Sequence, residues 1–392
     1  MDPTSDMPDI DELAPVSADA GAQLRYPKLE GALSPAREGS SLLDIGVFGI
    51  RNIPSTYSGY ETFCTILLPE LARRGHRVTL YSRDSFGWRE SYESVNRYGL
   101  PSIGTKQFDT LSHSIVSSFW ARIKRHDVVL TFNVANAPAL NFLTHTGTPT
   151  VLNVDGLEWT RDKWGSVGKR VFRWCAALSK RSATTLITDC YAMNDVYREE
   201  FGAESEVIPY CWTNLSAAEG RVASDDSLLA ELGLREREYV TVGGRLVPEN
   251  QIAEIVEGYL KSTSTLPIAV LGTANYDSPV KRRLDQLAQD SRVRILGHIS
   301  DRHTFGVLLR DADAYFHGHS VGGINPSLLE AMGVGAFVVA YDTSFNREAA
   351  GDHGTYFATA MNATAEYESA TPEQRDAQRV RNKQRIAERF SL

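Results

Sequence analysis

The chain has 392 residues, of which 42% are hydrophobic and 23% are charged, and its net charge is −8. This length predicts two domains of globular composition rather than one core. No apolar run reaches the roughly 20 residues of a membrane span. The four cysteines show no CxxC spacing, which fits a reducing compartment and gives no sign of a zinc site.

Residues 1–40 hold eight acidic and three basic side chains (3 − 8 = −5), which leaves −3 for the remainder. This segment is rich in Pro, Ala, Ser and Asp, so we expect a disordered acidic leader. It lacks the basic start and apolar middle of a signal peptide. The nearly neutral remainder argues against a nucleic-acid-binding protein.

Short apolar runs alternate with helix-period segments over 41–212. Strands are expected at 42–50, 76–83, 127–132, 148–154, 183–188 and 205–210. Helices are expected between them, the first ending at Arg74 before Gly75 and kinked by Pro69, the others at 109–124, 166–181 and 191–201. The alternation predicts a parallel sheet with helices on both faces.

A polar linker is expected at 213–236, followed by a second α/β domain at 237–360 and a C-terminal helix at 361–392. The second domain has apolar runs at 238–244, 267–272, 292–297, 312–318, 336–342 and 354–359. Two Rossmann-like domains would then face each other across a cleft. In such folds ligands bind outside the carboxyl ends of the strands.

The stretch VTVGGRLVPEN (240–250) leads from a strand through two glycines to a helix start. Gly244 would let the backbone approach a ligand, and the Arg245 guanidinium suits phosphate oxygens. The alternative is a tight turn with a surface arginine.

The stretch HGHSVGGINPSLLEAM (317–332) repeats this arrangement, with a turn at Gly322 and Gly323 before a helix. Asn325 or the following proline would begin or cap that helix. Free amides of Ser327 and Leu328 would then suit a diphosphate. Glu330 would accept hydrogen bonds from a ribose, or would simply stabilise the helix dipole.

The two histidines of this stretch raise the question of a metal. His317 and His319 would share one face of a strand, but zinc sites need three or four ligands and no further Cys or His has ligand spacing nearby. We therefore expect no metal, with His317 packed at the strand end and His319 in the cleft.

The first domain offers two candidate stretches. GIRNIPSTYSGYET (49–62) is a long loop that carries Arg51, Tyr57, Ser58, Gly59 and Glu61, and it is either a binding loop or a surface loop. In NVDGLEW (153–159), Asp155 follows a strand. Its carboxylate would take a proton or orient a hydroxyl, or it would form an Asx turn.

Residues 161–182 contain seven basic side chains and one acidic side chain. Val167, Val171, Trp174 and Leu178 recur at helical spacing. A basic amphipathic helix with tryptophan is typical of peripheral membrane contact. The interpretation that we favour is an ordinary docked helix whose apolar face packs against the domain.

Together these stretches resemble the family 4 glycosyltransferases, retaining enzymes of the GT-B fold. More narrowly, they resemble bacterial rhamnosyltransferases with an N-terminal domain of unknown function. The matching stretches are GIRNIPSTYSGYET, NVDGLEWTRDKW, GGRLVPEN and HGHSVGGINPSLLEAM with FNRE at 345–348. The resemblance covers about residues 42–390.

The resemblance implies a nucleotide-sugar donor bound mainly by the second domain and an acceptor bound mainly by the first. Arg245 would grip the diphosphate, Glu330 would hold the ribose as the second Glu of an E-x7-E motif, and Asp155 would orient sugar or acceptor. With Arg245 and Glu330, the donor site would comprise Gly59, Gly244, Asn250, Gly297, His298, Ile299, His319, Gly323, Asn325, Ser327 and Leu328. The acceptor side would comprise Arg51, Tyr57, Ser58 and Glu61.

The sequence departs from the family pattern at several positions. The first Glu of E-x7-E falls at Gly322, and Asn250 stands where a Lys is usual, so one cation faces the diphosphate unless His319 or Asn250 compensates. Asp155 falls near the position of a His in many relatives. The C-terminal helix is expected to be shortened, because relatives continue beyond AERFSL into a helix that crosses back.

The resemblance therefore implies metal-independent sugar transfer, with rhamnose favoured, from a nucleotide-diphospho-sugar to a cell-surface glycan or lipid-linked acceptor. The place would be the cytoplasm or the inner membrane face, with no other cofactor and no nucleic-acid partner. Two alternatives stay open, a GT-B-fold sugar-nucleotide epimerase and a catalytically weak nucleotide-sugar-binding protein.

Overall fold

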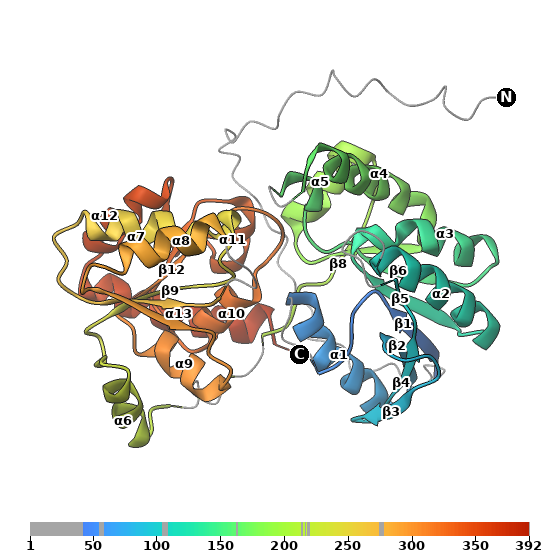
Figure 1. Ribbon diagram of the computed structural model, residues 1–392, viewed down its shortest axis with the longest axis horizontal. Coiled ribbons are helices and arrows are strands. Elements are labelled where there is room, and N and C mark those ends of the chain that lie inside the picture. The colour runs from blue at the N-terminus through green and yellow to red at the C-terminus, as the bar shows by residue number, and fades with distance from the viewer. Residues whose placement is uncertain are drawn as a thin grey trace. The chain divides into compact units, whose positions relative to one another are not determined.

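Short runs rich in valine, isoleucine and leucine form most strands of the first sheet. Such runs suit a parallel sheet, because its strands are covered by helices on both faces. The computed structural model describes residues 42–54, 59–103, 109–161, 164–212, 215, 217, 220–273 and 278–391 (Figure 1). The leader and the candidate residues Tyr57 and Ser58 lie outside this range. The described chain forms two α/β lobes, each around its own sheet.

The first sheet has eight strands in the order β3-β4-β2-β1-β5-β6-β7-β8. Its strands are β1 (Asp44–Phe48), β2 (Arg77–Arg83), β3 (Arg89–Tyr92), β4 (Val95–Leu100), β5 (Val128–Phe132), β6 (Thr150–Asn153), β7 (Thr185–Thr188) and β8 (Glu206–Val207). All neighbours pair in parallel except β3 with β4. The predicted parallel α/β fold is confirmed, but the β3–β4 hairpin was missed because its polar strands lack an apolar run.

Helices and 3-10 turns connect these strands. They are α1 (Gly59–Arg73), α2 (Asp109–Lys124), η2 (Val134–Asn136), α3 (Ala137–His145), η3 (Glu158–Thr160), α4 (Ser166–Ser182) and α5 (Tyr191–Phe201). The predicted end of the first helix before Gly75 is confirmed, since α1 ends one residue before Arg74.

The second sheet has six parallel strands in the order β11-β10-β9-β12-β13-β14. They are β9 (Val240–Gly243), β10 (Ile268–Leu271), β11 (Val293–Gly297), β12 (Ala314–His317), β13 (Val338–Tyr341) and β14 (Thr355–Phe357). This is the Rossmann order 3-2-1-4-5-6. The strand order reverses between β9 and β12, so their carboxyl ends mark the expected ligand position of this lobe.

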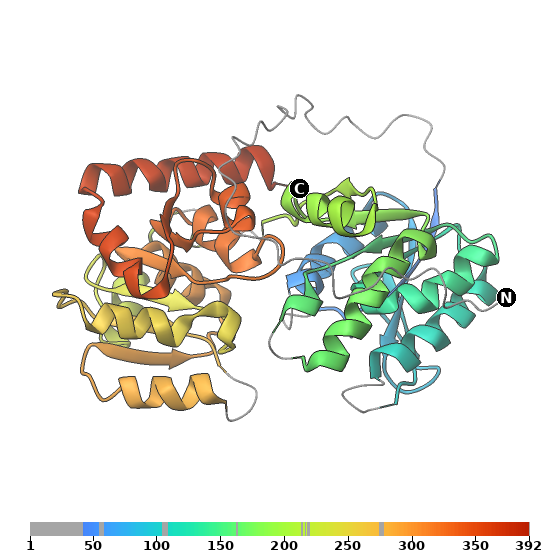
Figure 2. The same ribbon diagram turned by 90° about the horizontal axis from the view of Figure 1, so that it is seen from above.

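The second lobe carries its helices on both sides of this sheet. They are α6 (Ser224–Glu231), η5 (Pro248–Asn250), α7 (Ile252–Leu260), α8 (Pro279–Leu287), α9 (Arg302–Arg310), α10 (Pro326–Gly333), α11 (Ser344–Ala350), η6 (Ala360–Asn362), α12 (Ala363–Ser369) and α13 (Pro372–Arg389). Figure 2 shows α13 running along one side of this lobe, where it packs against α10. A capping box of Thr371 and Gln374 begins α13.

The segment expected as a polar linker contains α6, which is tied to α9 by a buried ion-pair network. Arg310 ends α9 and binds the carboxylates of Asp225 and Asp311. His303 Nε2 lies 2.9 Å from the second Asp225 oxygen. The described part of this segment therefore packs on the second lobe.

The interpretation of α4 as a helix docked through its apolar stripe is wrong. Val167, Val171 and Trp174 are 71%, 50% and 51% exposed. The buried side chains of α4 are instead small, namely Cys175, Ala176, Ser179 and Ser182. Small side chains let α4 approach α3 and η3 closely, which leaves the larger apolar residues outside. Within the described residues, no helix has both the length and the hydropathy to cross a bilayer.

Candidate functional site

The two glycine turns converge at the switch point of the second sheet. The buried Tyr315 hydroxyl on β12 lies 3.4 Å from the Gly243 carbonyl oxygen and 3.4 Å from Ser327 Oγ. A Cβ built on Gly244 would lie 2.9 Å from Asn250 Nδ2, so glycine at 244 is required by a close approach. The predicted stretches 243–250 and 317–330 are therefore brought together.

A chain of hydrogen bonds fixes the loop after β9 to the loop after β12. Asn250 Nδ2 donates to the Arg245 carbonyl oxygen at 2.8 Å, which turns Asn250 Oδ1 toward His319. His319 Nδ1 lies 2.9 Å from that oxygen and must donate to it. The Arg245 backbone is thus held, while its exposed side chain forms no hydrogen bond or ion pair with the described residues.

Both histidines of the stretch 317–332, His317 and His319, are buried and neutral. Burial lowers the pKa of His317 to about 3, and the prediction that it packs at the strand end is confirmed. Burial lowers the pKa of His319 well below its usual value, and the nearby Arg161 and Arg245 guanidinia lower it further. His319 therefore cannot supply the second cation. Asn250 cannot either, because its amide is neutral.

The expectation of free amides at the start of α10 is wrong. Asn325 is the N-cap, and its Oδ1 accepts from the Ser327 N–H at 3.0 Å. The Leu328 N–H donates to the Asn325 carbonyl oxygen at 3.0 Å. The cap satisfies both donors locally, so neither amide is directed at a ligand.

Glu330 lies on α10 and is buried, and it forms an ion pair with Arg302 of α9. Gly297 ends β11 with a φ of +75° and accepts from the Gly272 N–H at 2.7 Å. His298 and Ile299 follow it, the first exposed and the second partly buried. Among the described residues, no group of three or more His, Cys, Asp or Glu side chains is placed to hold a metal.

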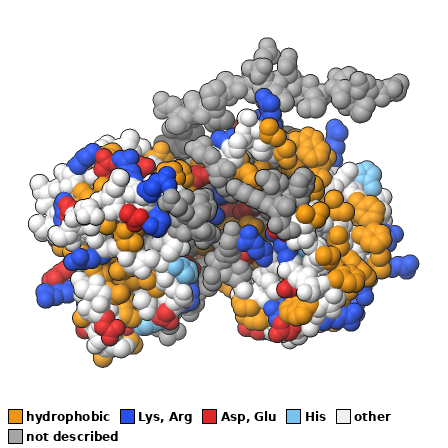
Figure 3. Space-filling model, viewed as in Figure 1, with side chains coloured by type: hydrophobic (Ala, Val, Ile, Leu, Met, Phe, Trp, Pro, Cys, Tyr) orange, Lys and Arg blue, Asp and Glu red, His pale blue; other side chains and the backbone are white. Residues whose placement is uncertain are grey.

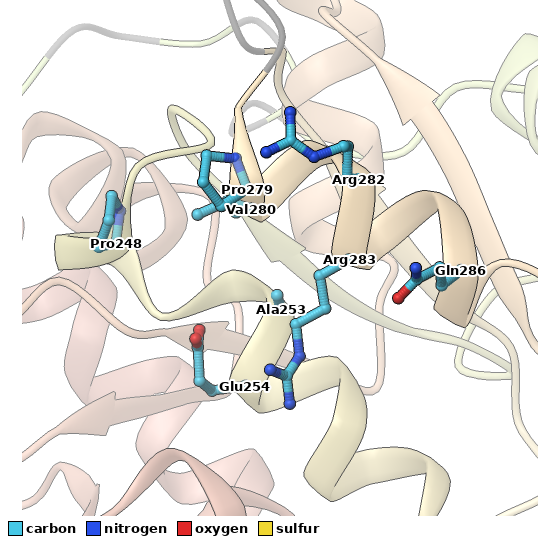
Figure 4. A pocket seen from close by; sticks show the side chains of 8 residues that line it. All are labelled: Pro248, Ala253, Glu254, Pro279, Val280, Arg282, Arg283 and Gln286. Atoms are coloured by element: carbon cyan, nitrogen blue, oxygen red, sulfur yellow. The ribbon is translucent and has the colours of Figure 1, made fainter.

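A depression lies beside this site rather than in it. Figure 4 shows its lining side chains on η5, α7 and α8. Its volume is about 460 Å³. Its lining residues are Pro248, Ala253, Glu254, Pro279, Val280, Arg282, Arg283 and Gln286. Pro248 alone comes from the candidate stretch 240–250, so this depression does not define the site.

Asp155 follows β6 in a left-handed conformation, with a φ of +61°. Its Oδ2 accepts from Asn133 Nδ2 at 3.0 Å, and Asn133 itself has a φ of +73° after β5. Two non-glycine residues in this region at neighbouring strand ends are a form of strain that clusters at functional sites.

Of the acceptor-side residues that the structure describes, Arg51 is exposed and Glu61 is buried. Glu61 lies in the first turn of α1 and accepts from the Arg51 N–H at 3.0 Å, so it ties the backbone at Arg51 to the start of α1. Gly59 meets the start of α10, where a Cβ would lie 2.9 Å from Pro326 Cγ. The structure therefore places Gly59 next to the donor-side residues.

Asp189 and Glu348 are buried carboxyl groups that the sequence analysis did not single out. A Cβ on Gly323 would lie 1.9 Å from Asp189 Oδ2, so the Gly323 backbone lies against this carboxyl group. Burial and the nearby Asp155 and Glu348 charges raise the pKa of Asp189 to about 7. Glu348 accepts from the Tyr191 and Ala192 N–H groups at 2.8 and 2.9 Å, which caps α5.

Signals for these residues exist in the sequence. Asp189 directly follows β7, as Asp155 follows β6. Glu348 ends the FNRE stretch, and Arg161 lies within NVDGLEWTRDKW.

Two α/β lobes, the second with two glycine turns at its switch point, define a protein of the GT-B type. Residues 58–211 match a glycosyl transferase 4-like domain, and residues 226–370 match the glycosyl transferases group 1 domain. The chain thus carries two glycosyltransferase domains. This confirms the predicted resemblance to glycosyltransferases of the GT-B fold.

Solved structures agree on the fold. A sucrose-phosphate synthase from Thermosynechococcus elongatus superposes with a TM-score of 0.71 at 16% identity, covering 89% of this chain and 95% of that one. Anabaena HepE in complex with UDP-glucose gives 0.69 at 15% identity, with 89% and 96% covered. A UDP-forming trehalose-phosphate synthase from Burkholderia vietnamiensis gives 0.69 at 11%, with 89% and 94% covered. No curated protein sequence matches the chain.

Proposed function

We propose that the protein is a retaining glycosyltransferase that moves a sugar, with rhamnose favoured, from a nucleotide-diphospho-sugar to a cell-surface glycan or lipid-linked acceptor. The observation that carries this proposal is the convergence of both glycine turns at the switch point, with the Arg245 side chain exposed beside them. Similar folds have been crystallised with UDP and UDP-glucose. No metal is required in this proposal, because Arg245 stabilises the leaving diphosphate.

The proposed chemistry needs no strong protein base. The bond between the anomeric carbon and the phosphate oxygen breaks, and the acceptor oxygen forms its bond to the same face of that carbon. The acceptor proton passes to the leaving phosphate oxygen. The protein then contributes positioning and stabilisation of leaving-group charge. Asp155, fixed by Asn133, would orient a hydroxyl of the sugar or acceptor.

One observation favours a second candidate, a sugar-nucleotide epimerase. Epimerisation needs acid and base groups near the sugar, and Asp189 has a pKa raised to about 7 by burial beside Gly323. A carboxyl group with such a pKa exchanges protons near neutral pH.

One assay separates the candidates. Purified protein is incubated with dTDP-rhamnose, UDP-glucose and related donors, with and without a lipid-linked acceptor. A glycosylated acceptor with released nucleotide supports transfer, and an isomerised sugar nucleotide supports epimerisation. Binding of a donor without any turnover would reduce the protein to a nucleotide-sugar binder and contradict the proposal.

Arg245→Ala is expected to weaken donor binding by about 1.5–3 kcal/mol, the range for hydrogen bonds to charged groups. The exposed guanidinium would lose its contacts with the diphosphate, while the backbone of the turn keeps its bond to Asn250. Calorimetric titration with the donor measures the change. Arg294→Ala removes an exposed arginine from β11 as a control and should bind normally. Equal affinities for both variants would exclude Arg245 from the site.

The acceptor side of the proposal gains support from exposed apolar side chains on the first lobe. Leu111, Ile115, Phe119 and Ile123 recur every four residues on α2, and all are exposed. Val167, Val171 and Trp174 are exposed on α4, and α3 packs between the two helices. Figure 3 shows hydrophobic side chains gathered over this lobe. Exposed basic residues on α4, among them Arg170, would suit an anionic membrane surface.

Replacing Trp174 by serine is expected to weaken binding to vesicles of phosphatidylcholine and phosphatidylglycerol roughly tenfold, because burial of a large apolar side chain contributes about 1.5–3 kcal/mol. Cosedimentation measures the bound fraction. Val380→Ser removes an exposed apolar side chain from α13 of the other lobe and should have no effect. Wild-type protein that stays in the supernatant would refute membrane contact through α4.

A further inference from the structure

The Arg161 guanidinium lies at the turn that precedes α10. A Cβ built on Gly322 would lie 3.4 Å from Arg161 Nη2, and one built on Gly156 would lie 2.8 Å from the same atom. The two glycine backbones are themselves close, since the Gly322 Cβ would lie 3.5 Å from the Gly156 Cα. Arg161 therefore brings a positive charge from the first lobe to the glycine turn after β12.

Neighbouring side chains hold Arg161 in this position. Glu158 Oε1 lies 2.9 Å from Arg161 Nε, while Glu158 Oε2 accepts from Trp164 Nε1 at 2.8 Å. The geometry at Arg161 Nε does not make a hydrogen bond with any described residue. The arginine side chain is 12% exposed. An ion pair and burial thus orient the guanidinium, which lowers the entropy lost when it binds a ligand.

Arg161 and Arg245 act on the same small region. Both guanidinia lie near enough to His319 to lower its pKa. The buried neutral imidazole adds no charge, and the cap at Asn325 satisfies the amides of Ser327 and Leu328. Within the described part of the chain, positive charge near His319 therefore comes from two arginines, one in each lobe.

We propose that Arg161 is the second cation of the donor diphosphate site and binds one phosphate while Arg245 binds the other. This inference rests on the proposed function. The φ of +98° at 322 favours glycine, and a carboxylate at this position would lie close to the guanidinium and compete with the diphosphate for it. Arg161 is a binding and positioning residue in this proposal, since it compensates the diphosphate charge.

Calorimetric titrations with UDP and dTDP, and with uridine and thymidine, test this inference. Arg161→Gln should weaken binding of the diphosphate about tenfold or more, as expected for a lost charged hydrogen bond, and should leave nucleoside binding unchanged. Arg170→Gln removes an exposed base from α4 and should change neither. A structural role for Arg161 predicts equal losses for nucleoside and diphosphate, and that result would overturn the inference.

A second pair of variants leaves the Glu158–Arg161 ion pair in place. Gly322→Ala and Gly322→Glu carry the same backbone strain, because φ at 322 is +98°. The added carboxylate would pair with Arg161, so Gly322→Glu should bind UDP or dTDP at least tenfold more weakly than Gly322→Ala. Equal or tighter binding by Gly322→Glu would overturn the inference alone. Wild-type protein that binds neither diphosphate would overturn the proposed function with it.

Discussion

Arg310→Met is expected to reduce the free energy of unfolding by about 3–5 kcal/mol, the usual cost of removing one partner from a buried ion pair. Arg310 uses all five of its N–H donors. They bind Asp225 Oδ2 at 2.7 Å, both Asp311 oxygens at 2.6 and 2.8 Å, and the Ala217 and Gly220 carbonyl oxygens. Methionine would leave two carboxylates buried without their guanidinium. Urea denaturation measures the loss.

Surface arginines provide the matched control for this variant. Arg198 on α5 pairs with Asp195 in an exposed i,i+3 pair, and Arg198→Met should cost less than about 1 kcal/mol. Similar losses for the two variants would contradict the importance of the buried network.

Acid should reduce the difference between wild type and Arg310→Met. Burial opposes ionisation of Asp225, but its bonds to Arg310, the Val222 amide and His303 lower its pKa to about 2. The stability from this ionised group is present above the unfolded pKa of about 4 and is lost as pH falls toward 2.

Much of the fold could be predicted because buried parallel strands appear in the sequence as short apolar runs. Each predicted apolar run overlaps an observed strand, and the glycine stop at 75 was confirmed. The β3–β4 hairpin escaped because an edge pair has polar side chains. The stripe on α4 misled for a different reason: helical periodicity identifies an apolar face but does not say whether another element covers it. On α4 the covered face consists of small residues such as Ala176 and Ser179.

The candidate site could be located but not resolved from the sequence. Glycines after β9 and β12 identify the switch point, since strand ends are visible in the sequence and the strand order follows a rule. The protonation state of the histidines and the capping of α10 could not be predicted from the sequence in this way. Burial keeps His319 neutral. The Ser327 N–H is not available to a ligand because it already donates to Asn325 Oδ1. Arg161 belongs to the other lobe, and only the folded chain brings it to Gly322.

Charged groups are arranged differently around His319 and around Gly323. Arg161 and Arg245 supply positive charge near His319, while Asp189, which lies against Gly323, is near the Asp155 and Glu348 carboxylates. An arginine side chain stays ionised even where it is mostly buried, as Arg161 is, because the ordinary pKa of a guanidinium group is above about 12. Burial instead raises the pKa of the Asp189 carboxyl group to about 7, because burial penalises the charged form.

Asp189→Asn is expected to abolish a pH dependence of stability that the wild-type protein shows between about pH 4 and pH 7. Burial and the Asp155 and Glu348 carboxylates raise the folded pKa of Asp189 to about 7, above an unfolded value of about 4. In this window the folded protein binds more protons than the unfolded chain, so its free energy of unfolding falls as pH rises, by about 1.4 kcal/mol per pH unit. Urea denaturation across this range measures the slope.

Asparagine should fit the Asp189 site because it has nearly the same shape and its oxygen can still accept from the Cys190 thiol, which lies 3.2 Å from Asp189 Oδ1. Since the amide does not ionise, the variant should be more stable than wild type at pH 7 by on the order of 3–4 kcal/mol and equal to it near pH 4. The exposed Asp352→Asn substitution should preserve the wild-type slope. A slope unchanged in Asp189→Asn would mean that Asp189 is ionised in the folded protein, and it would remove the acid–base group on which the epimerase alternative depends.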